Sequence, residues 1–198
     1  MTATLPVGVV LAGGSGRRIG GDKAIVELEG RPLVLYPIEA LHEVVDEVAV
    51  VAKRSTVLPA LAGSAALWIE PDEPRHPLCG VVHALRLAAG RAVLVVGCDM
   101  PLMDGPTLRA LAGTDPGGAA AVVPRVHGEL QPFCALYTPA ALAGLATFDP
   151  GARATVVVEQ LGIRVVEPAD ATPFFNVNRP EDLIQASVLI GRDDVSAR

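Results

Sequence analysis

Cysteine is scarce in this chain, and its few cysteines fit neither a metal site nor a disulfide framework. The three residues are Cys79, Cys98 and Cys134, and no CxxC pair occurs. An odd count without such pairs argues against both a zinc site and a set of structural disulfides. Because reduced thiols are usual in the cytosol, we expect the protein to be cytoplasmic.

Long apolar runs and an excess of basic residues are also missing. No stretch of 18 apolar residues occurs, so we expect no membrane-spanning helix. No basic segment precedes the first apolar stretch, which argues against a signal peptide. The chain has 16 Lys and Arg against 22 Asp and Glu, a net charge of −6. A nonspecific nucleic-acid binder needs a broad basic surface, so we expect neither nucleic acid nor membrane as a partner.

What the chain does contain is enough apolar residues to fold around its own core. It has 198 residues, of which 51% are hydrophobic and 19% charged. This length is typical of one domain, and this composition of a packed rather than a disordered chain. We expect one domain over residues 1–190 and a frayed tail over residues 191–198.

Short apolar runs alternate with helical patterns along the chain. This alternation predicts an α/β fold, namely a single-domain, Rossmann-like, three-layer architecture with a mostly parallel mixed sheet. Ligands bind such sheets at the carboxyl ends of the strands, which points to the loops after Leu11, Ile69 and Gly97. The predicted strands cover residues 7–11, 48–52, 66–69, 92–97, 119–123, 133–137 and 163–167, with a turn at His127 and Gly128 between the fifth and sixth. The predicted helices cover residues 32–45, 58–62, 80–89, 105–111 (capped by Asp104), 139–146, 152–160 and 180–190.

The first of these loops has the composition of an anion-binding loop. It reads LAGGSGRRIGGDK over residues 11–23. Its glycines let backbone amides approach a phosphate, and Arg17, Arg18 and Lys23 add positive charge. The segment lacks the GK[ST] of a P-loop, and Ile19 stands where a dinucleotide fingerprint needs its third glycine. A simple connection between a strand and a helix, with solvated charges, remains the alternative.

Five segments of the chain follow one another in the order of a known family's motifs. LAGGSGRRIGGDK is similar to LAGGxxxRMGxDK, and it is followed by EPDE with PLCG, by GCDMP, by QPFCALY and by FNVNRPEDL. Over residues 7–183 the chain thereby resembles the molybdenum cofactor guanylyltransferases, which are MobA-like NTP transferases. Two positions depart from the pattern: His76 stands where glycine is usual, and Arg179 where threonine is usual. Both departures bear on how the acceptor would bind.

The resemblance implies a reaction and its partners. The terminal phosphate of molybdopterin would attack the α-phosphorus of GTP, and pyrophosphate would leave. Mg²⁺ is the implied cofactor, and GTP and molybdopterin are the implied substrates, with other proteins of molybdenum cofactor biosynthesis as further partners. The resemblance assigns the fold to the nucleotidyltransferases and residues 1–190 to the transferase domain.

The resemblance also implies roles for particular residues. Lys23 and Arg17 would stabilise charge on the triphosphate, with Arg18 as a weaker candidate. Asp99 would hold Mg²⁺, which takes one or two carboxylates together with phosphate oxygens. The implied catalytic residues are therefore Lys23, Asp99 and Arg17. The implied nucleotide-binding residues are Leu11, Ala12, Gly13, Gly14, Gly16, Lys23, Asp72 and Asp99.

Two further assignments keep an alternative open. Asp72 would accept hydrogen bonds from the N1–H and amino groups of guanine, a role for which Glu70 and Glu73 compete. Asn176 and Asn178 would face the acceptor, since residues i and i+2 of an extended segment point the same way, and Asn178 could also lend an oxygen to the metal. Alternatively, both amides satisfy backbone groups before the last helix.

Other functions compete with this interpretation. A molybdenum cofactor cytidylyltransferase or a sugar-1-phosphate nucleotidyltransferase would use a similar first loop. A non-catalytic nucleotide-binding adaptor would belong to a different class, but such a protein has no need to keep both Lys23 and Asp99. Ile19 disfavours a dinucleotide-dependent oxidoreductase.

Overall fold

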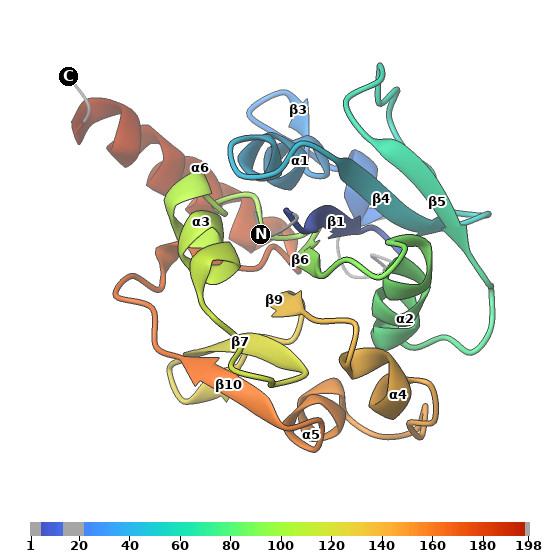
Figure 1. The fold of residues 1–198 in the computed structure, drawn as a ribbon. Coiled ribbons are helices and arrows are strands. Elements are labelled where there is room, and N and C mark those ends of the chain that lie inside the picture. Colours follow the sequence, from blue (N-terminus) through green and yellow to red (C-terminus); the bar gives the residue numbers. More distant parts are fainter. Residues whose placement is uncertain (1–4, 14–21, 197–198) are drawn as a thin grey trace.

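A computed structural model describes residues 5–13 and 22–196 of the chain. In these residues the protein is a three-layer α/β fold around one mixed sheet (Figure 1). The eight-stranded sheet has the order β10-β7-β9-β6-β1-β4-β5, with β8 paired to β7, and a two-stranded sheet lies apart from it. The strands of the large sheet are β1 (Val7–Leu11), β4 (Val48–Lys53), β5 (Ala66–Glu70), β6 (Val93–Gly97), β7 (Ala121–Val126), β8 (Glu129–Leu130), β9 (Cys134–Tyr137) and β10 (Ile163–Val166); the small sheet pairs β2 (Glu27–Leu28) with β3 (Arg31–Pro32).

The sheet is parallel where the sequence predicts crossover connections. Strands β6, β1, β4 and β5 run parallel, while β9 is antiparallel to both β6 and β7. Consecutive side chains on a strand point to opposite faces, so Val9 and Val10 pack into two different hydrophobic clusters. The predicted fold class is therefore confirmed.

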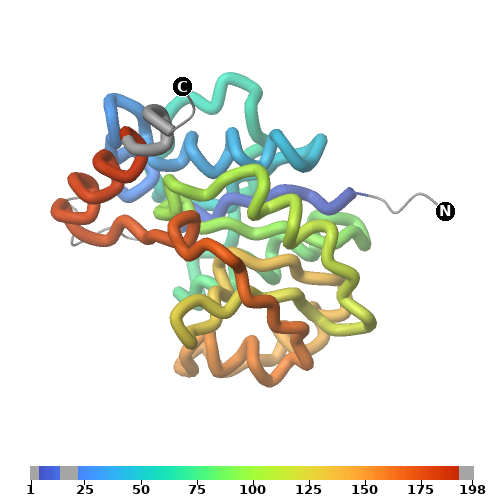
Figure 2. The backbone as a smooth tube through the Cα atoms, turned by 90° about the vertical axis from the view of Figure 1, so that its left-hand side faces the viewer, coloured from blue at the N-terminus to red at the C-terminus, as the bar shows by residue number. Residues whose placement is uncertain are grey.

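Helices cover both faces of the sheet. Helices α1 (Leu35–His42) and α3 (Gly105–Gly113) lie on one face, and α2 (Pro77–Leu87), α4 (Ala141–Leu145) and α5 (Ala154–Glu159) lie on the other (Figure 1). The last helix, α6 (Pro180–Ser196), lies at the margin beside β2, and Figure 2 shows this red helix next to the blue segment that holds β2 and β3. No helix among the described residues is both long and apolar enough to cross a membrane.

Two predicted helices differ from the structure. Helix α1 begins at Leu35 rather than at residue 32, because Pro32 belongs to β3 and Pro37 falls within the first turn, where its missing N–H is tolerated. The helix predicted over residues 58–62 is wrong: the segment is irregular and ends in a turn where Ala62 and Gly63 have φ values of 47° and 80°.

Two local signals are confirmed. The turn at His127 and Gly128 is found, with φ values of 50° and 82°, but it joins β7 to the short strand β8 and not directly to β9. Asp104 caps α3, and its carboxylate accepts a 2.8 Å hydrogen bond from the backbone N–H of Thr107. Helix α6 begins at Pro180 as predicted and continues past residue 190 to Ser196.

Candidate active site

A cavity of about 570 Å³ opens at the carboxyl ends of β1, β4, β5 and β6. It lies where a parallel sheet of this kind places its ligand. Its walls combine small and apolar residues with charged side chains of both signs. The lining residues are Leu11, Gly13, Asp22, Lys23, Val51, Lys53, Ser55, Thr56, Glu70, Asp72, Arg75, His76, Pro77, Gly80, Gly97, Cys98, Asp99 and Phe133.

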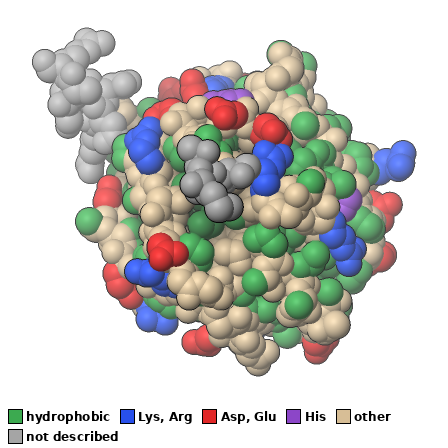
Figure 3. Space-filling view, in the orientation of Figure 1, with side chains coloured by type: hydrophobic (Ala, Val, Ile, Leu, Met, Phe, Trp, Pro, Cys, Tyr) green, Lys and Arg blue, Asp and Glu red, His purple; other side chains and the backbone are tan. Residues whose placement is uncertain are grey.

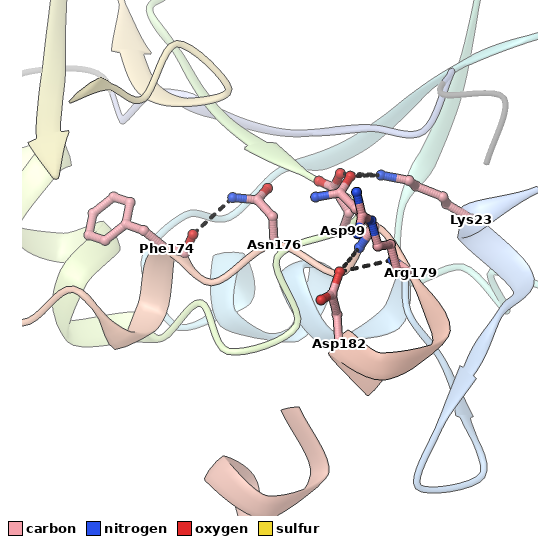
Figure 4. Close-up of polar contacts among 7 residues, drawn as sticks. Lys23, Asp99, Phe174, Asn176, Arg179 and Asp182 are labelled. Atoms are coloured by element: carbon pink, nitrogen blue, oxygen red, sulfur yellow. Dashed lines mark hydrogen bonds and ion pairs between the residues drawn. The ribbon is translucent and has the colours of Figure 1, made fainter. Parts of the chain in front are cut away.

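Lys23, Asp99 and Asn178 meet at one end of this site. The ammonium of Lys23 lies 2.7 Å from Asp99 Oδ2 and donates a 2.6 Å hydrogen bond to Asn178 Oδ1. Figure 4 shows Lys23 pointing toward Asp99 from the opposite side of the site. Segments that lie far apart in the chain thus supply a cation, an anion and an amide to one point. The cation can bind a phosphate oxygen directly, and the anion can bind the metal ion that accompanies a phosphate.

The local structure explains why Asp99 and Asn178 lie there. Asp99 lies just past the fully buried strand β6. A side chain at Gly97 would approach Asp99 Oδ1 to 2.6 Å, so a larger residue there would displace the carboxylate. The backbone N–H of Val177 donates to the carbonyl of Asp99. Asp182 in the first turn of α6 accepts hydrogen bonds from the N–H groups of Asn178 and Arg179 (Figure 4), which fixes the start of the helix.

The two asparagines lie in different surroundings. Asn178 faces Lys23, whereas the amide of Asn176 donates a 2.9 Å hydrogen bond to the carbonyl of Phe174 (Figure 4). Asn176 also lines a second cavity of about 610 Å³, between the β7–β8 hairpin and the segment before α6. The second cavity is lined by Val126, His127, Glu129, Gln131, Ala171, Thr172, Phe174, Phe175, Asn176 and Leu189.

Only some of the other residues predicted to bind the nucleotide line the first cavity. Leu11, Gly13 and Asp72 line the first cavity, with Asp72 exposed to solvent, while Ala12 is buried behind the wall. Glu73 forms a surface ion pair with Arg75. Gly14, Gly16, Arg17 and Arg18 lie outside the described residues.

Lys53 and Glu70 also line the cavity, and no role was predicted for Lys53 from the sequence. Their side chains end β4 and β5, and Lys53 Nζ lies 3.5 Å from Glu70 Oε1. Burial raises the pKa of the Glu70 carboxyl, and the Lys53 ammonium opposes that rise. The available sequence signal was position, since charged residues at the ends of neighbouring parallel strands meet at one sheet edge.

His76, one of the two departures from the family pattern, serves the start of α2. Its Nδ1 accepts a 3.2 Å hydrogen bond from the N–H of Leu78, and its Nε2 lies 3.1 Å from the carbonyl of Ala152. Its ring packs against Phe148 with centroids 4.8 Å apart. His76 therefore links α2 to the segment before α5 while lining the cavity.

The donor set near Lys23 suits a hard cation. Asp99 contributes carboxylate oxygens and Asn178 an amide oxygen, the ligand types that Mg²⁺ prefers. Among the described residues no group of three or more His, Cys, Asp or Glu side chains could hold a metal ion. A cation held here would take most of its oxygens from a bound phosphate or from water, which is usual for Mg²⁺.

The charge around the site is mixed. The cavity lining carries charged side chains of both signs, and Figure 3 shows acidic, basic and hydrophobic side chains interspersed over the opposite face as well, where β1 begins. Buried beside Asp99, Cys98 is 3% exposed, and burial raises the pKa of its thiol far above the usual range. Cys98 is therefore a packing residue in this site rather than a nucleophile.

Solved structures with this fold define the class. A Methanothermobacter nucleotidyl transferase superimposes with a TM-score of 0.77 at 23% identity, with 96% of this chain and 99% of that chain covered. A molybdopterin-guanine dinucleotide biosynthesis protein A from Archaeoglobus fulgidus gives a TM-score of 0.73 at 24% identity, covering 94% and 99%. The fold is that of the nucleotidyltransferases.

Sequence comparison narrows the class to a family. The model of the MobA-like NTP transferase domain matches residues 8–165, and the chain belongs to that family. It is 35% identical over 192 residues to a molybdenum cofactor guanylyltransferase of Cereibacter sphaeroides, covering 94% of this chain and 97% of the relative. A Shewanella piezotolerans protein of the same name is 30% identical, covering 100% and 99%. The predicted family is thus confirmed, and the chain is a nucleotidyltransferase.

Proposed function

We propose that this protein transfers GMP from GTP to the terminal phosphate of molybdopterin and so forms the guanine dinucleotide form of the molybdenum cofactor. An oxygen of the acceptor phosphate forms a bond to the α-phosphorus of GTP, and the bond to the bridging oxygen breaks as pyrophosphate leaves. The single observation that carries the proposal is the meeting of Lys23, Asp99 and Asn178 beside a cavity of about 570 Å³ that Lys23 and Asp99 line. Relatives named molybdenum cofactor guanylyltransferase over nearly the whole chain support the choice of substrates.

The chain's own residues act mainly by alignment and charge. The Lys23 ammonium lies where it would neutralise charge that grows on the phosphate oxygens as the bond breaks. Asp99 and Asn178 would hold Mg²⁺, which when bound would neutralise the triphosphate and orient it. Arg17 would stabilise the leaving pyrophosphate, as the resemblance implies.

The acceptor is assigned to the side of Asn176. The second cavity combines the aromatic rings of Phe174 and Phe175 with the amides of Gln131 and Asn176. Aromatic faces and amide groups suit a flat, polar-edged heterocycle such as a pterin. Because Asn178 follows two residues later beside Lys23, the same segment would carry the acceptor from its ring to its phosphate.

Pyrophosphate release tests the proposal. Purified protein with Mg²⁺, molybdopterin and inorganic pyrophosphatase should release phosphate with GTP and much more slowly with CTP or ATP. Preference for CTP would assign the chain to the cytidylyltransferases. Turnover with a sugar 1-phosphate as acceptor would assign it to the sugar-1-phosphate nucleotidyltransferases. Binding of GTP without any turnover would favour a nucleotide-binding adaptor.

The location and further partners follow from the same proposal. The three cysteines are free thiols in the structure, which is in keeping with a reducing cytoplasm. We place the protein there, where it would hand its product to other proteins of molybdenum cofactor biosynthesis.

A further inference from the structure

A largely buried ion pair, Lys53 with Glu70, lines the first cavity. Lys53 and Glu70 are neighbours in register at the ends of β4 and β5, and Lys53 Nζ lies 3.5 Å from Glu70 Oε1. Their side chains are only 14% and 7% exposed. Burying two charges is unfavourable unless their remaining hydrogen-bonding groups are satisfied, so the other contacts of this pair decide what it does.

Those contacts are incomplete among the described residues. Glu70 Oε2 is shielded from solvent and has no hydrogen-bond partner there. Lys53 Nζ donates 2.8 Å to the carbonyl of Pro71. The Lys53 ammonium has three N–H donors. Two are directed at Pro71 and Glu70, so within the described part of the chain one is free to donate to a ligand. The pair thus leaves both a donor and an acceptor to be matched by a ligand.

The surroundings keep space for such a ligand. Glu70, Lys53, Gly13 and Gly80 all line the same cavity of about 570 Å³. The glycine at position 13 lets the carboxylate lie close to the first loop, since a side chain there would approach Glu70 Oε1 to 2.7 Å. Leu11 and Val51 supply apolar surface to the same cavity. Apolar walls around a few convergent polar groups are typical of a site for an aromatic ring.

We propose that Glu70 and Lys53 read the guanine base. The carboxylate accepts from the adjacent N1–H and amino donors, and the ammonium donates to O6. This assignment rests on the proposed function, and it replaces Asp72 as the residue that recognises the base. Asp72 is exposed to solvent, where a hydrogen bond discriminates poorly because water competes for it. The buried pair has no such competition.

Nucleotide titrations with base analogues test the assignment. Inosine triphosphate (ITP) lacks the 2-amino group of guanine, so the wild-type protein should bind it less tightly than GTP. Glu70→Gln should lower GTP affinity about tenfold or more, the scale of a lost bidentate base contact, and should close the gap between GTP and ITP. A merely structural role would lower both affinities together. Glu47→Gln removes a carboxylate that pairs with Arg91 on the surface, and it should leave both affinities unchanged.

Lys53→Met gives an independent measurement if Glu70→Gln does not fold. Methionine keeps much of the alkyl length and removes the donor, so this variant should lose discrimination between GTP and 2-aminopurine riboside triphosphate, which lacks O6. The proposal would be overturned if Glu70→Gln still bound GTP more tightly than ITP while Asp72→Asn bound both equally. If the wild-type protein itself prefers CTP or ATP to GTP, the proposed function fails instead, and the two failures are thereby told apart.

Discussion

The ammonium of Lys23 lies 2.7 Å from the carboxylate of Asp99, although 76 positions separate the two residues in the chain. Their side chains are 14% and 23% exposed, so the pair is sheltered from solvent but open to a ligand. The attraction between the two opposite charges stabilises both of them in this sheltered position. A triphosphate with its cation presents the complementary arrangement, since its oxygens suit Lys23 and its cation suits Asp99.

Lys23→Ala should abolish most activity without unfolding the protein. Removal of one preorganised charge contact to phosphate typically slows turnover by about 100-fold or more. Stability should change little, because Asp99 remains partly exposed and can be hydrated. Pyrophosphate release and thermal melting measure the two effects separately.

Arg86→Ala is the matched control for this change, because Arg86 is an exposed cation on α2. It should keep both turnover and melting temperature. If Lys23→Ala has near-normal turnover and a normal melting curve, the first loop only connects structural elements and does not bind phosphate.

Asp99→Asn should remove the metal dependence of turnover together with most of the turnover itself. The amide keeps the shape of the carboxylate but lacks the charge that attracts Mg²⁺. A magnesium titration of initial rates checks this, with Asp46→Asn as the control at an exposed site. If Asp99→Asn is active at ordinary magnesium concentrations, the cation is held elsewhere.

The fold and the position of Asp99 in the candidate site could be predicted from the sequence because both depend on local pattern. Buried β-branched runs such as 93–97 predict parallel strands, and a carboxylate directly after such a run must lie at the sheet's ligand-binding edge. Asp99 is found there. Asp104 likewise follows from the preference for an aspartate before a helix.

The rest depends on contacts between distant segments, which no local pattern reveals. Lys53 belongs to no motif, and only its place at the end of a strand distinguishes it from an ordinary surface lysine. Its importance comes from its register with Glu70 on the neighbouring strand. In the same way, alternation along an extended segment placed Asn176 and Asn178 on one side, but the turn at Phe174 gives Asn176 a backbone partner. The link from His76 to Ala152 also spans 76 positions.

Cys98 and Cys134 should resist alkylation in the native protein. Burial raises the pKa of both thiols, so almost none of either is present as the reactive thiolate near neutral pH. Cys79 is only partly buried and should react first. Iodoacetamide labelling followed by mass spectrometry, with and without urea, measures the order. Modification of Cys98 in the folded protein would mean that the site opens far enough to expose it.

Asn176 and Asn178 should give different results on substitution, because the structure gives their side chains different partners. Asn178→Ala removes the 2.6 Å contact with Lys23, and the loss of a hydrogen bond to a charged group should slow turnover by about tenfold or more. Asn176→Ala removes the bond to Phe174 and should lower the free energy of unfolding by about 1 kcal/mol. It should also weaken molybdopterin binding more than GTP binding, because Asn176 lines the second cavity rather than the first. GTP titration, molybdopterin fluorescence and urea denaturation of both variants separate these effects. Lowered stability with unchanged molybdopterin binding in both would mean that the amides serve only the backbone and that the acceptor binds elsewhere.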